Sequence, residues 1–140
     1  MIDQYGRTID YLRLSVTDLC NYRCRYCMPE EGVEKGPHGS VITVEECGEI
    51  ARVAVKLGVR KIRITGGEPL FQKEAVAALV KLLDEAGMDV ALYTGHDKED
   101  VPEEILAHIK YLKAGPFLKK LRTATTPFVG STNQTFERIK

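Results

Sequence analysis

The sequence predicts an α/β fold, an open partial (β/α) barrel with about four to five parallel strands. Residues alternate between apolar and polar at 11–16 and 61–65, as in strands, and a third strand is expected at 89–93. Between these strands, at 43–57 and 73–86, apolar residues recur at three- and four-residue steps, as in helices. Strands that alternate with helices pair in parallel through right-handed crossovers. So few units cannot close an eight-stranded barrel, which needs roughly 200 residues or more.

Local signals set the expected ends of the elements. Thr43–Glu46 has the sequence of a capping box and predicts the start of the first helix. Gly87 is expected to end the second helix, since glycine readily takes the left-handed conformation of a helix C-terminus. Asp100 and Pro102 predict a third helix in which the aspartate is the N-cap. A fourth strand is expected at 111–113, and beyond residue 120 the sequence gives only weak signals.

Composition narrows the classes of protein that need to be considered. The chain has 140 residues, of which 44% are hydrophobic, so we expect residues 1–140 to form one domain. Its 20 basic and 20 acidic residues balance, which argues against binding to a nucleic acid polymer or to an anionic membrane. No apolar run approaches the roughly 20 residues of a membrane span, and the start does not resemble a secretion signal. We therefore expect a cytoplasmic protein.

Three closely spaced cysteines carry the strongest chemical signal. Cys20, Cys24 and Cys27 form a C-x3-C-x2-C array, and thiolates are the usual ligands of iron–sulfur clusters. A saturated cubane cluster normally takes four such ligands, so three leave one iron open. An open coordination position distinguishes a catalytic metal site from a structural one. The array therefore predicts a cluster that binds a cofactor or substrate directly.

The cysteines allow two other interpretations. A structural zinc site needs four ligands, usually in paired C-x2-C elements, and the three histidines lack the spacing to complete one. Cys47 could be a fourth cluster ligand, but it lies on the apolar stripe of the first expected helix. A free cysteine in that position behaves as a small buried hydrophobic residue, so we expect Cys47 in the core.

The conspicuous motifs all follow predicted strands. The cysteine array comes after the first strand, Gly66–Pro69 after the second, and Thr94–Gly95 after the third. In open α/β sheets, ligands collect at the carboxyl ends of the strands. The sequence therefore predicts one site at that edge, where Gly66 and Gly67 would allow the main chain to approach a ligand closely.

The cysteine array together with Gly66-Gly67-Glu68-Pro69 resembles the radical S-adenosylmethionine (SAM) superfamily. The resemblance implies a 4Fe-4S cluster on Cys20, Cys24 and Cys27, with SAM bound to its open iron. It also implies that Tyr26 packs near the adenine and that Gly66, Gly67, Glu68 and Pro69 bind the methionine end. One-electron reduction would cleave SAM to methionine and a 5'-deoxyadenosyl radical, which abstracts a hydrogen atom from the substrate.

The first half, from Tyr5 to Leu70, closely resembles the GTP cyclases that begin molybdenum cofactor biosynthesis. In that family the arginines that match Arg13 and Arg63 contact the nucleotide. Strand alternation independently places both on a polar face, where they could form a small anion site. The family also binds a second cluster through three further cysteines near its C-terminus, whereas no cysteine follows Cys47 here.

The second half resembles the activating enzymes of anaerobic ribonucleotide reductase, through motifs at 92–95, 115–117 and 130–134. This resemblance gives the leading interpretation: an activase whose partner is a large glycyl radical enzyme, reduced by a protein such as flavodoxin or ferredoxin. For residues 130–134, a purely structural turn remains an alternative interpretation. Two alternatives remain for the whole chain. One is a nucleotide-directed radical SAM catalyst that uses Arg13 and Arg63, and the other is an iron–sulfur electron carrier that does not bind SAM.

Overall fold

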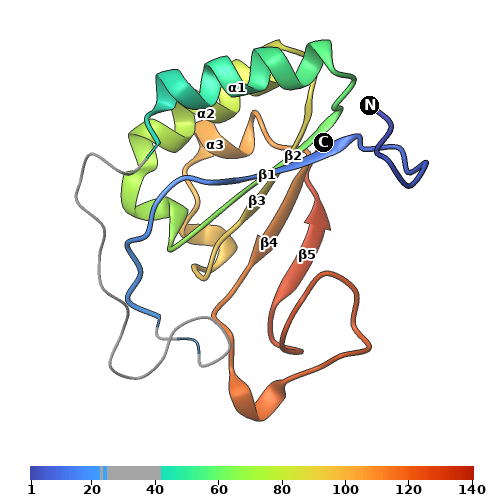
Figure 1. The fold of residues 1–140 in the computed structure, drawn as a ribbon. Coiled ribbons are helices and arrows are strands. Elements are labelled where there is room, and N and C mark those ends of the chain that lie inside the picture. Colours follow the sequence, from blue (N-terminus) through green and yellow to red (C-terminus); the bar gives the residue numbers. More distant parts are fainter. Residues whose placement is uncertain (23, 25–41) are drawn as a thin grey trace.

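A single five-stranded sheet organises the fold in the computed structural model, which describes residues 1–22, 24 and 42–140. The strands lie in sequence order, and the first four are parallel, whereas the fifth runs antiparallel to the fourth (Figure 1). Within the described residues the sheet is not closed, so the predicted open α/β architecture is confirmed. The strands are β1 Tyr11–Ser15, β2 Lys61–Thr65, β3 Asp89–Tyr93, β4 Tyr111–Ala114 and β5 Thr135–Arg138.

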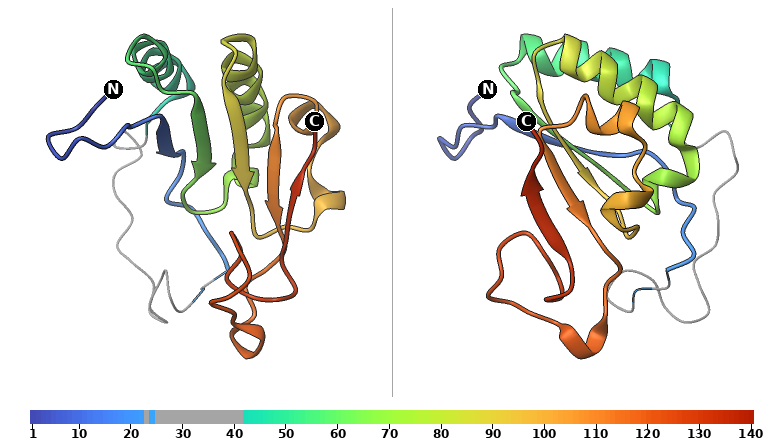
Figure 2. Two further views of the ribbon diagram at one scale, coloured as in Figure 1. Left: turned by 90° about the vertical axis from the view of Figure 1, so that its right-hand side faces the viewer. Right: turned by 180° about the vertical axis from the view of Figure 1, so that it is seen from behind.

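The α-helices all cover the same face of the sheet (Figures 1 and 2). They are α1 Val44–Lys56, α2 Lys73–Glu85 and the short α3 Glu103–Leu106. Three 3-10 helices complete the described elements: η2 Pro69–Gln72, η3 Lys98–Asp100 and η4 Lys119–Leu121. No α-helix in the described part of the chain covers the opposite side of the sheet, which we call the open face.

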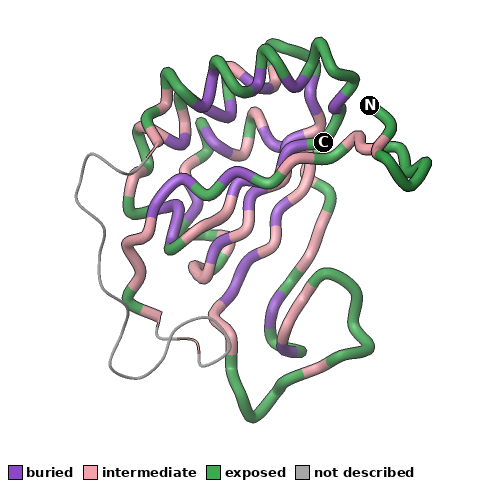
Figure 3. The backbone as a smooth tube through the Cα atoms, viewed as in Figure 1, coloured by how far each residue is buried: buried purple, intermediate pink, exposed green. Residues whose placement is uncertain are grey.

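The hydrophobic core lies between the sheet and the helices (Figure 3). Alternation along each strand places Ile62 and Ile64 of β2 against the helices, and both are fully buried. The side chains of Leu79 and Leu83, which are four residues apart on α2, meet them from the other side. Fully burying a side chain of this size stabilises a fold by about 1.5–3 kcal/mol. This core fixes the orientation of the strands whose ends carry the predicted site.

The predicted start of α1 is confirmed at the level of single hydrogen bonds. Thr43 is the N-cap: its Oγ1 accepts a bond from the Glu46 amide at 3.2 Å. In return, Glu46 Oε2 accepts a bond from the Thr43 amide at 2.8 Å. Both partners of the capping box are therefore present, and two amides that the helix cannot satisfy internally gain acceptors.

The predicted cap of the third helix is wrong. Asp100 closes the 3-10 helix η3 instead, and Pro102 is the N-cap of α3, without a side-chain hydrogen bond. The physical reason is the proline. It disfavours helical geometry in the residue before it, and Val101 is accordingly extended, with φ −81° and ψ 121°. The extended Val101 thus separates Asp100 from the start of α3 at Glu103.

The segment after β4 contains a strand that the sequence did not predict. Strand β5 pairs with β4 in antiparallel register, from Ala114↔Thr135 to Tyr111↔Arg138. The buried side chain of Gln134, just before β5, connects the turns that lead into the two strands. Its Oε1 accepts bonds from the amides of Gly130 and Ser131 at 2.9 and 3.2 Å, and its Nε2 donates to the Gly115 carbonyl at 2.8 Å. The motif at 130–134 therefore serves as a structural turn. None of the described helices is both long and apolar enough to cross a membrane.

Candidate active site

The Gly66–Gly67 loop leaves β2 and packs directly on the segment that leads to Cys20. Both glycines have positive φ, +88° and +41°, which residues with a Cβ rarely adopt. A Cβ on Gly66 would lie 2.8 Å from the Ser15 Cα, and one on Gly67 would lie 2.9 Å from the Leu19 carbonyl carbon. The Glu68 amide also donates to the Leu19 carbonyl at 2.7 Å. The protein's own packing therefore requires both glycines.

The carboxylate of Glu68 joins the end of β2 to the end of β3. Its side chain is 1% exposed. Oε1 accepts bonds from the Leu70 amide at 3.0 Å and from the Thr94 hydroxyl at 2.6 Å, and Oε2 accepts one from the Gly95 amide at 2.8 Å. Glu68, predicted as a SAM contact, thus has three partners within the protein. Pro69, also predicted there, is buried as the first residue of η2.

Tyr22 attaches the cysteine segment to the end of β3. A Cβ on Gly95 would lie 2.8 Å from the Tyr22 ring, so the absence of a side chain there lets the ring lie on the main chain. The ring also meets His96 edge-on, with centroids 5.7 Å apart. Burial raises the pKa of Tyr22, and the nearby Glu68 adds to this shift. Sequence reasoning missed Tyr22, although its place between two cysteines was a usable signal.

The predicted cluster ligands lie only partly within the described residues. Cys20 and Cys24 are partly exposed at the carboxyl edge of the sheet, while Cys27 and the predicted adenine contact Tyr26 lie outside the described residues. Lys113, at the end of β4, was not predicted. Burial lowers the pKa of Lys113 below its usual value. The nearby Cys24 and Glu68 partly offset this shift.

The Lys113 ammonium group is held by main-chain oxygens. Its Nζ donates to the carbonyls of Thr94 and Gly115 at 3.4 and 3.3 Å. Lysine is rarely buried without polar partners, and these bonds are long for an ammonium group. A partly buried cation therefore lies at the same edge of the sheet as Cys24.

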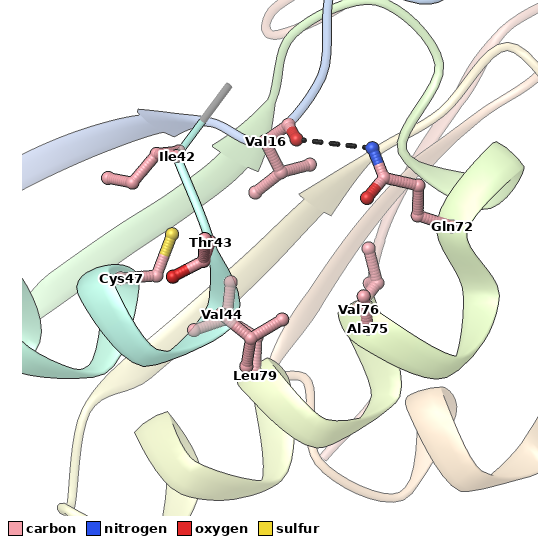
Figure 4. Close-up of a pocket in the computed structure, with 9 residues that line it drawn as sticks. All are labelled: Val16, Ile42, Thr43, Val44, Cys47, Gln72, Ala75, Val76 and Leu79. Atoms are coloured by element: carbon pink, nitrogen blue, oxygen red, sulfur yellow. Dashed lines mark hydrogen bonds between the residues drawn. The ribbon is translucent and has the colours of Figure 1, made fainter. Parts of the chain in front are cut away.

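Cys47 is buried away from this edge, as predicted. It is 1% exposed, and burial raises the pKa of its thiol. Its sulfur faces a cavity of about 50 Å³ between β1, α1 and α2 (Figure 4). The lining is largely apolar and includes Val76 and Leu79, while Gln72 Nε2 donates to the Val16 carbonyl at 3.4 Å. Its environment is that of a core residue.

The two predicted substrate arginines are brought together on the open face. Arg13 of β1 and Arg63 of β2 are partners in the parallel register. The Arg63 guanidinium lies 4.1 Å from the centroid of the Tyr93 ring and 5.3 Å from that of Tyr11. Among the described residues, Arg63 Nε is the one buried side-chain polar atom without a hydrogen-bond partner. The two strands thus place the two arginines next to each other on the open face, at the β1 edge of the sheet.

Comparison with known proteins identifies the class to which this fold and edge site belong. The family model of the radical SAM superfamily matches residues 14–116, and the chain belongs to that superfamily. Its members are enzymes that use a 4Fe-4S cluster and SAM. The match runs from within β1 to just beyond β4, so it includes the cysteine array, the glycine loop and the end of β3.

Similar proteins include several that are named GTP 3',8-cyclase. The chain is 58% identical to the protein of Geobacter sulfurreducens over 82 residues, which are 59% of this chain and 25% of that protein. It is 51% identical over 89 residues to the protein of Desulforamulus reducens, covering 64% of this chain and 27% of that protein. For Alkaliphilus metalliredigens the identity is 45% over 95 residues, with coverages of 67% and 30%. The matched region thus spans 25% to 30% of these relatives' length.

The leading interpretation from the sequence, an activase with a large glycyl radical enzyme as partner, is wrong. The relatives bear the name of a GTP cyclase and not of an activase. The structure gives a physical reason why the second-half motifs misled. Asn133 Nδ2 donates to the Pro116 carbonyl at 2.8 Å, and Gln134 Nε2 donates to the Gly115 carbonyl. These residues hold the chain's own turns together.

Proposed function

We propose that the chain is a radical SAM enzyme that acts on a guanine nucleotide, with Cys20, Cys24 and Cys27 as the ligands of its 4Fe-4S cluster. When bound, the cluster supplies the electron that cleaves SAM to methionine and a 5'-deoxyadenosyl radical. Tyr26 and the loop Gly66–Pro69 are the proposed contacts of SAM. Glu68 would act on this loop through the hydrogen bonds that connect it to β3.

The residues at the carboxyl edge suit such a cluster. Two of the three thiols are partly exposed there, as ligands of an open site must be. Only the thiolate binds metal, and a neighbouring cation favours the thiolate over the thiol. Lys113 is close enough to Cys24 for the two to influence each other electrostatically. The glycine loop packs on Leu19, and Tyr22 packs on Gly95, so the chain is held in place on both sides of Cys20.

One observation carries the proposal for the nucleotide: Arg13 and Arg63 lie side by side in the register of β1 and β2. Arg63 Nε is buried without a hydrogen-bond partner, so a phosphate would approach the terminal nitrogens of the guanidinium group and not Nε itself. The planar guanidinium fork matches the geometry of phosphate. The relatives' name adds the identity of the nucleotide, GTP. We therefore place the phosphates at Arg13 and Arg63.

The proposed chemistry is the transfer of one hydrogen atom. A carbon–hydrogen bond of the ribose breaks homolytically, and the hydrogen atom joins the 5'-deoxyadenosyl carbon. The products are 5'-deoxyadenosine and a nucleotide radical. The chain's own part is to position the nucleotide, through the arginine pair, near the edge where SAM would bind. We limit the proposal to this step, since the matched region spans only 25% to 30% of the relatives' length.

Deuterium transfer tests this proposal. The reconstituted protein would be incubated anaerobically with SAM, dithionite and GTP deuterated throughout the ribose, and 5'-deoxyadenosine analysed by mass spectrometry. We expect one deuterium in the product. Arg63→Gln should reduce the transfer at least tenfold, since each 1.4 kcal/mol of lost binding is a factor of about ten. Arg60→Gln, an exposed arginine just before β2, is the matched control and should leave it unchanged. Unlabelled 5'-deoxyadenosine in undiminished amount would refute GTP as the hydrogen donor.

We also propose that residues 1–140 form one domain that works in the cytoplasm. All five described strands belong to one sheet, which supports a single folding unit. The cytoplasm keeps thiols reduced, as cluster ligands require.

A further inference from the structure

Four aromatic side chains gather on the open face at the β4–β5 side of the sheet. We call this group the aromatic wall. Phe136 is its centre: the ring centroids lie 4.5 Å from Phe128, 5.8 Å from Tyr111 and 6.1 Å from Tyr93. Phe136 and Tyr111 are nearly parallel, with 10° between their planes. The members of the wall are Tyr93, Tyr111, Phe128 and Phe136.

Phe128 is an unusual member of this group because it is both exposed and strained. Its side chain is 62% exposed, so its burial contributes little to the fold. Its φ is +66°, and it is the only non-glycine residue with positive φ in the described ranges. A residue with a side chain in this region costs about 1–3 kcal/mol. Glycine would fit this backbone without that cost, so a strained and exposed ring is a candidate for a role in binding.

The wall adjoins a strongly basic surface. The residues that the five strands direct to the open face include the cations Arg13, Arg63, Lys113 and Arg138. Asp89 is the one carboxylate among them, and it accepts a hydrogen bond from Lys110 Nζ at 2.7 Å. The open face is thus basic, although the whole chain has a formal net charge of zero. Such a surface favours a multiply charged anion.

Tyr93 connects the basic surface to the wall. The Arg63 guanidinium lies 4.1 Å from the centroid of the Tyr93 ring, and the Phe136 ring also contacts Tyr93. A ligand on this face would therefore meet cations and flat aromatic surfaces next to each other. A nucleotide has both matching parts, since phosphates pair with guanidinium groups and purine bases stack on aromatic side chains.

We propose that the aromatic wall is the base-binding subsite of this face, where the purine stacks on Phe128 and Phe136 while its phosphates reach Arg13 and Arg63. This inference rests on the proposed function, and it adds the residues that would distinguish a nucleotide from a bare polyphosphate. Because the Phe128 ring is largely exposed, it contributes little to the stability of the fold. Its removal should therefore weaken nucleotide binding without destabilising the protein.

Comparing two ligands distinguishes the contribution of the base to binding from that of the phosphates. Calorimetry would measure the affinity of the full chain for GTP and for inorganic tripolyphosphate. Phe128→Gly should weaken GTP about tenfold, the usual cost of losing one base–aromatic stack, and leave tripolyphosphate within about twofold. Phe128→Leu, which keeps an apolar side chain but no ring, should also weaken GTP. Arg63→Gln should weaken both ligands. Tyr5→Ala removes an exposed aromatic ring outside the wall and should change neither affinity.

The outcomes distinguish this inference from the function on which it rests. If the wild-type chain binds GTP and Arg63→Gln weakens it, but both Phe128 variants bind GTP normally, the wall is only a small structural cluster and the inference fails alone. If the wild-type chain does not bind GTP, the proposed function fails with it. Thermal unfolding provides a second readout. Phe128→Gly should melt at the same or a higher temperature than wild type, because glycine relieves the strain.

Discussion

Glu68 illustrates how a single motif residue can serve the site indirectly. Its carboxylate is 1% exposed and accepts hydrogen bonds from the Thr94 hydroxyl and the Gly95 amide, so it fixes the glycine loop against β3. Gly95 is also the residue on which the Tyr22 ring lies. One buried carboxylate thereby connects the glycine loop, the end of β3 and the cysteine segment.

We expect Glu68→Gln to destabilise the protein by about 1–3 kcal/mol, because the amide nitrogen that replaces one oxygen would face a donor and leave it unsatisfied. Urea unfolding measures this change. Glu85→Gln is the matched control: Glu85 is exposed at the end of α2, and its substitution should stay within about 0.5 kcal/mol of wild type. Equal stability of the two variants would mean that the Glu68 hydrogen bonds contribute little.

The sequence predicted on which face of a strand or helix a side chain lies better than it predicted which residues that side chain contacts. Alternation alone placed Arg13 and Arg63 on one polar face, and the register confirms that they are neighbours. The apolar stripe likewise placed Cys47 in the core. The partners of Glu68 could not be predicted, because Thr94 is 26 residues away and only the parallel pairing of β2 and β3 brings the two together. Phe128 gave no signal, since its contacts depend on the path of an irregular segment.

At the scale of elements, Asp84 anchors the segment after β5 to α2. Its Oδ1 accepts a hydrogen bond from Lys140 Nζ at 2.6 Å, and its Oδ2 lies 2.9 Å from His108 Nδ1, just beyond α3. The bond from Lys140, followed by that from His108, lowers the pKa of Asp84 below its usual 3.8. A carboxylate with a lowered pKa in the folded state stabilises the fold above its unfolded pKa, and this contribution is lost as pH falls through the folded pKa.

The corresponding variant is Asp84→Asn. We expect it to be less stable than wild type by about 0.5–1 kcal/mol at pH 7, because solvent screens a pair that is partly exposed. The difference should shrink as the pH falls below about 4. Thermal melting at a series of pH values checks this, and Lys140→Met should reproduce part of the effect. A difference that is constant from pH 7 to pH 3 would exclude the ionised form of Asp84 as its origin.

Element prediction succeeded where a local signal dominated and failed where the tertiary structure decided. The capping box at Thr43 and the alternation in β2 are local, and both were found as predicted. The third helix was misplaced because two local signals compete: Asp100 is a good cap, but Pro102 forces the preceding residue to be extended. Strand β5 depends on β4 for all its pairing, so its own sequence could not reveal it.

In the molecule as a whole, the two faces of the sheet differ in character. The face covered by helices contains the core, while the open face carries arginines and aromatic rings, where we propose that the nucleotide binds. The carboxyl edge, where Cys20 and the glycine loop meet, lies between the two. Sequence patterns sufficed for this architecture and for the superfamily, because the motifs follow strands. They did not suffice for the substrate, because the second-half motifs have structural roles that resemble functional ones.

The proposed SAM-cleaving cluster site on three cysteines is tested by reductant-dependent formation of 5'-deoxyadenosine by the anaerobically reconstituted chain. We expect wild type and Cys47→Ala to form it, since Cys47 lies in the core. Cys20→Ala, Cys24→Ala and Cys27→Ala should each form none. Formation of 5'-deoxyadenosine by any of these three variants, or its absence from the reconstituted wild type, would contradict the assignment.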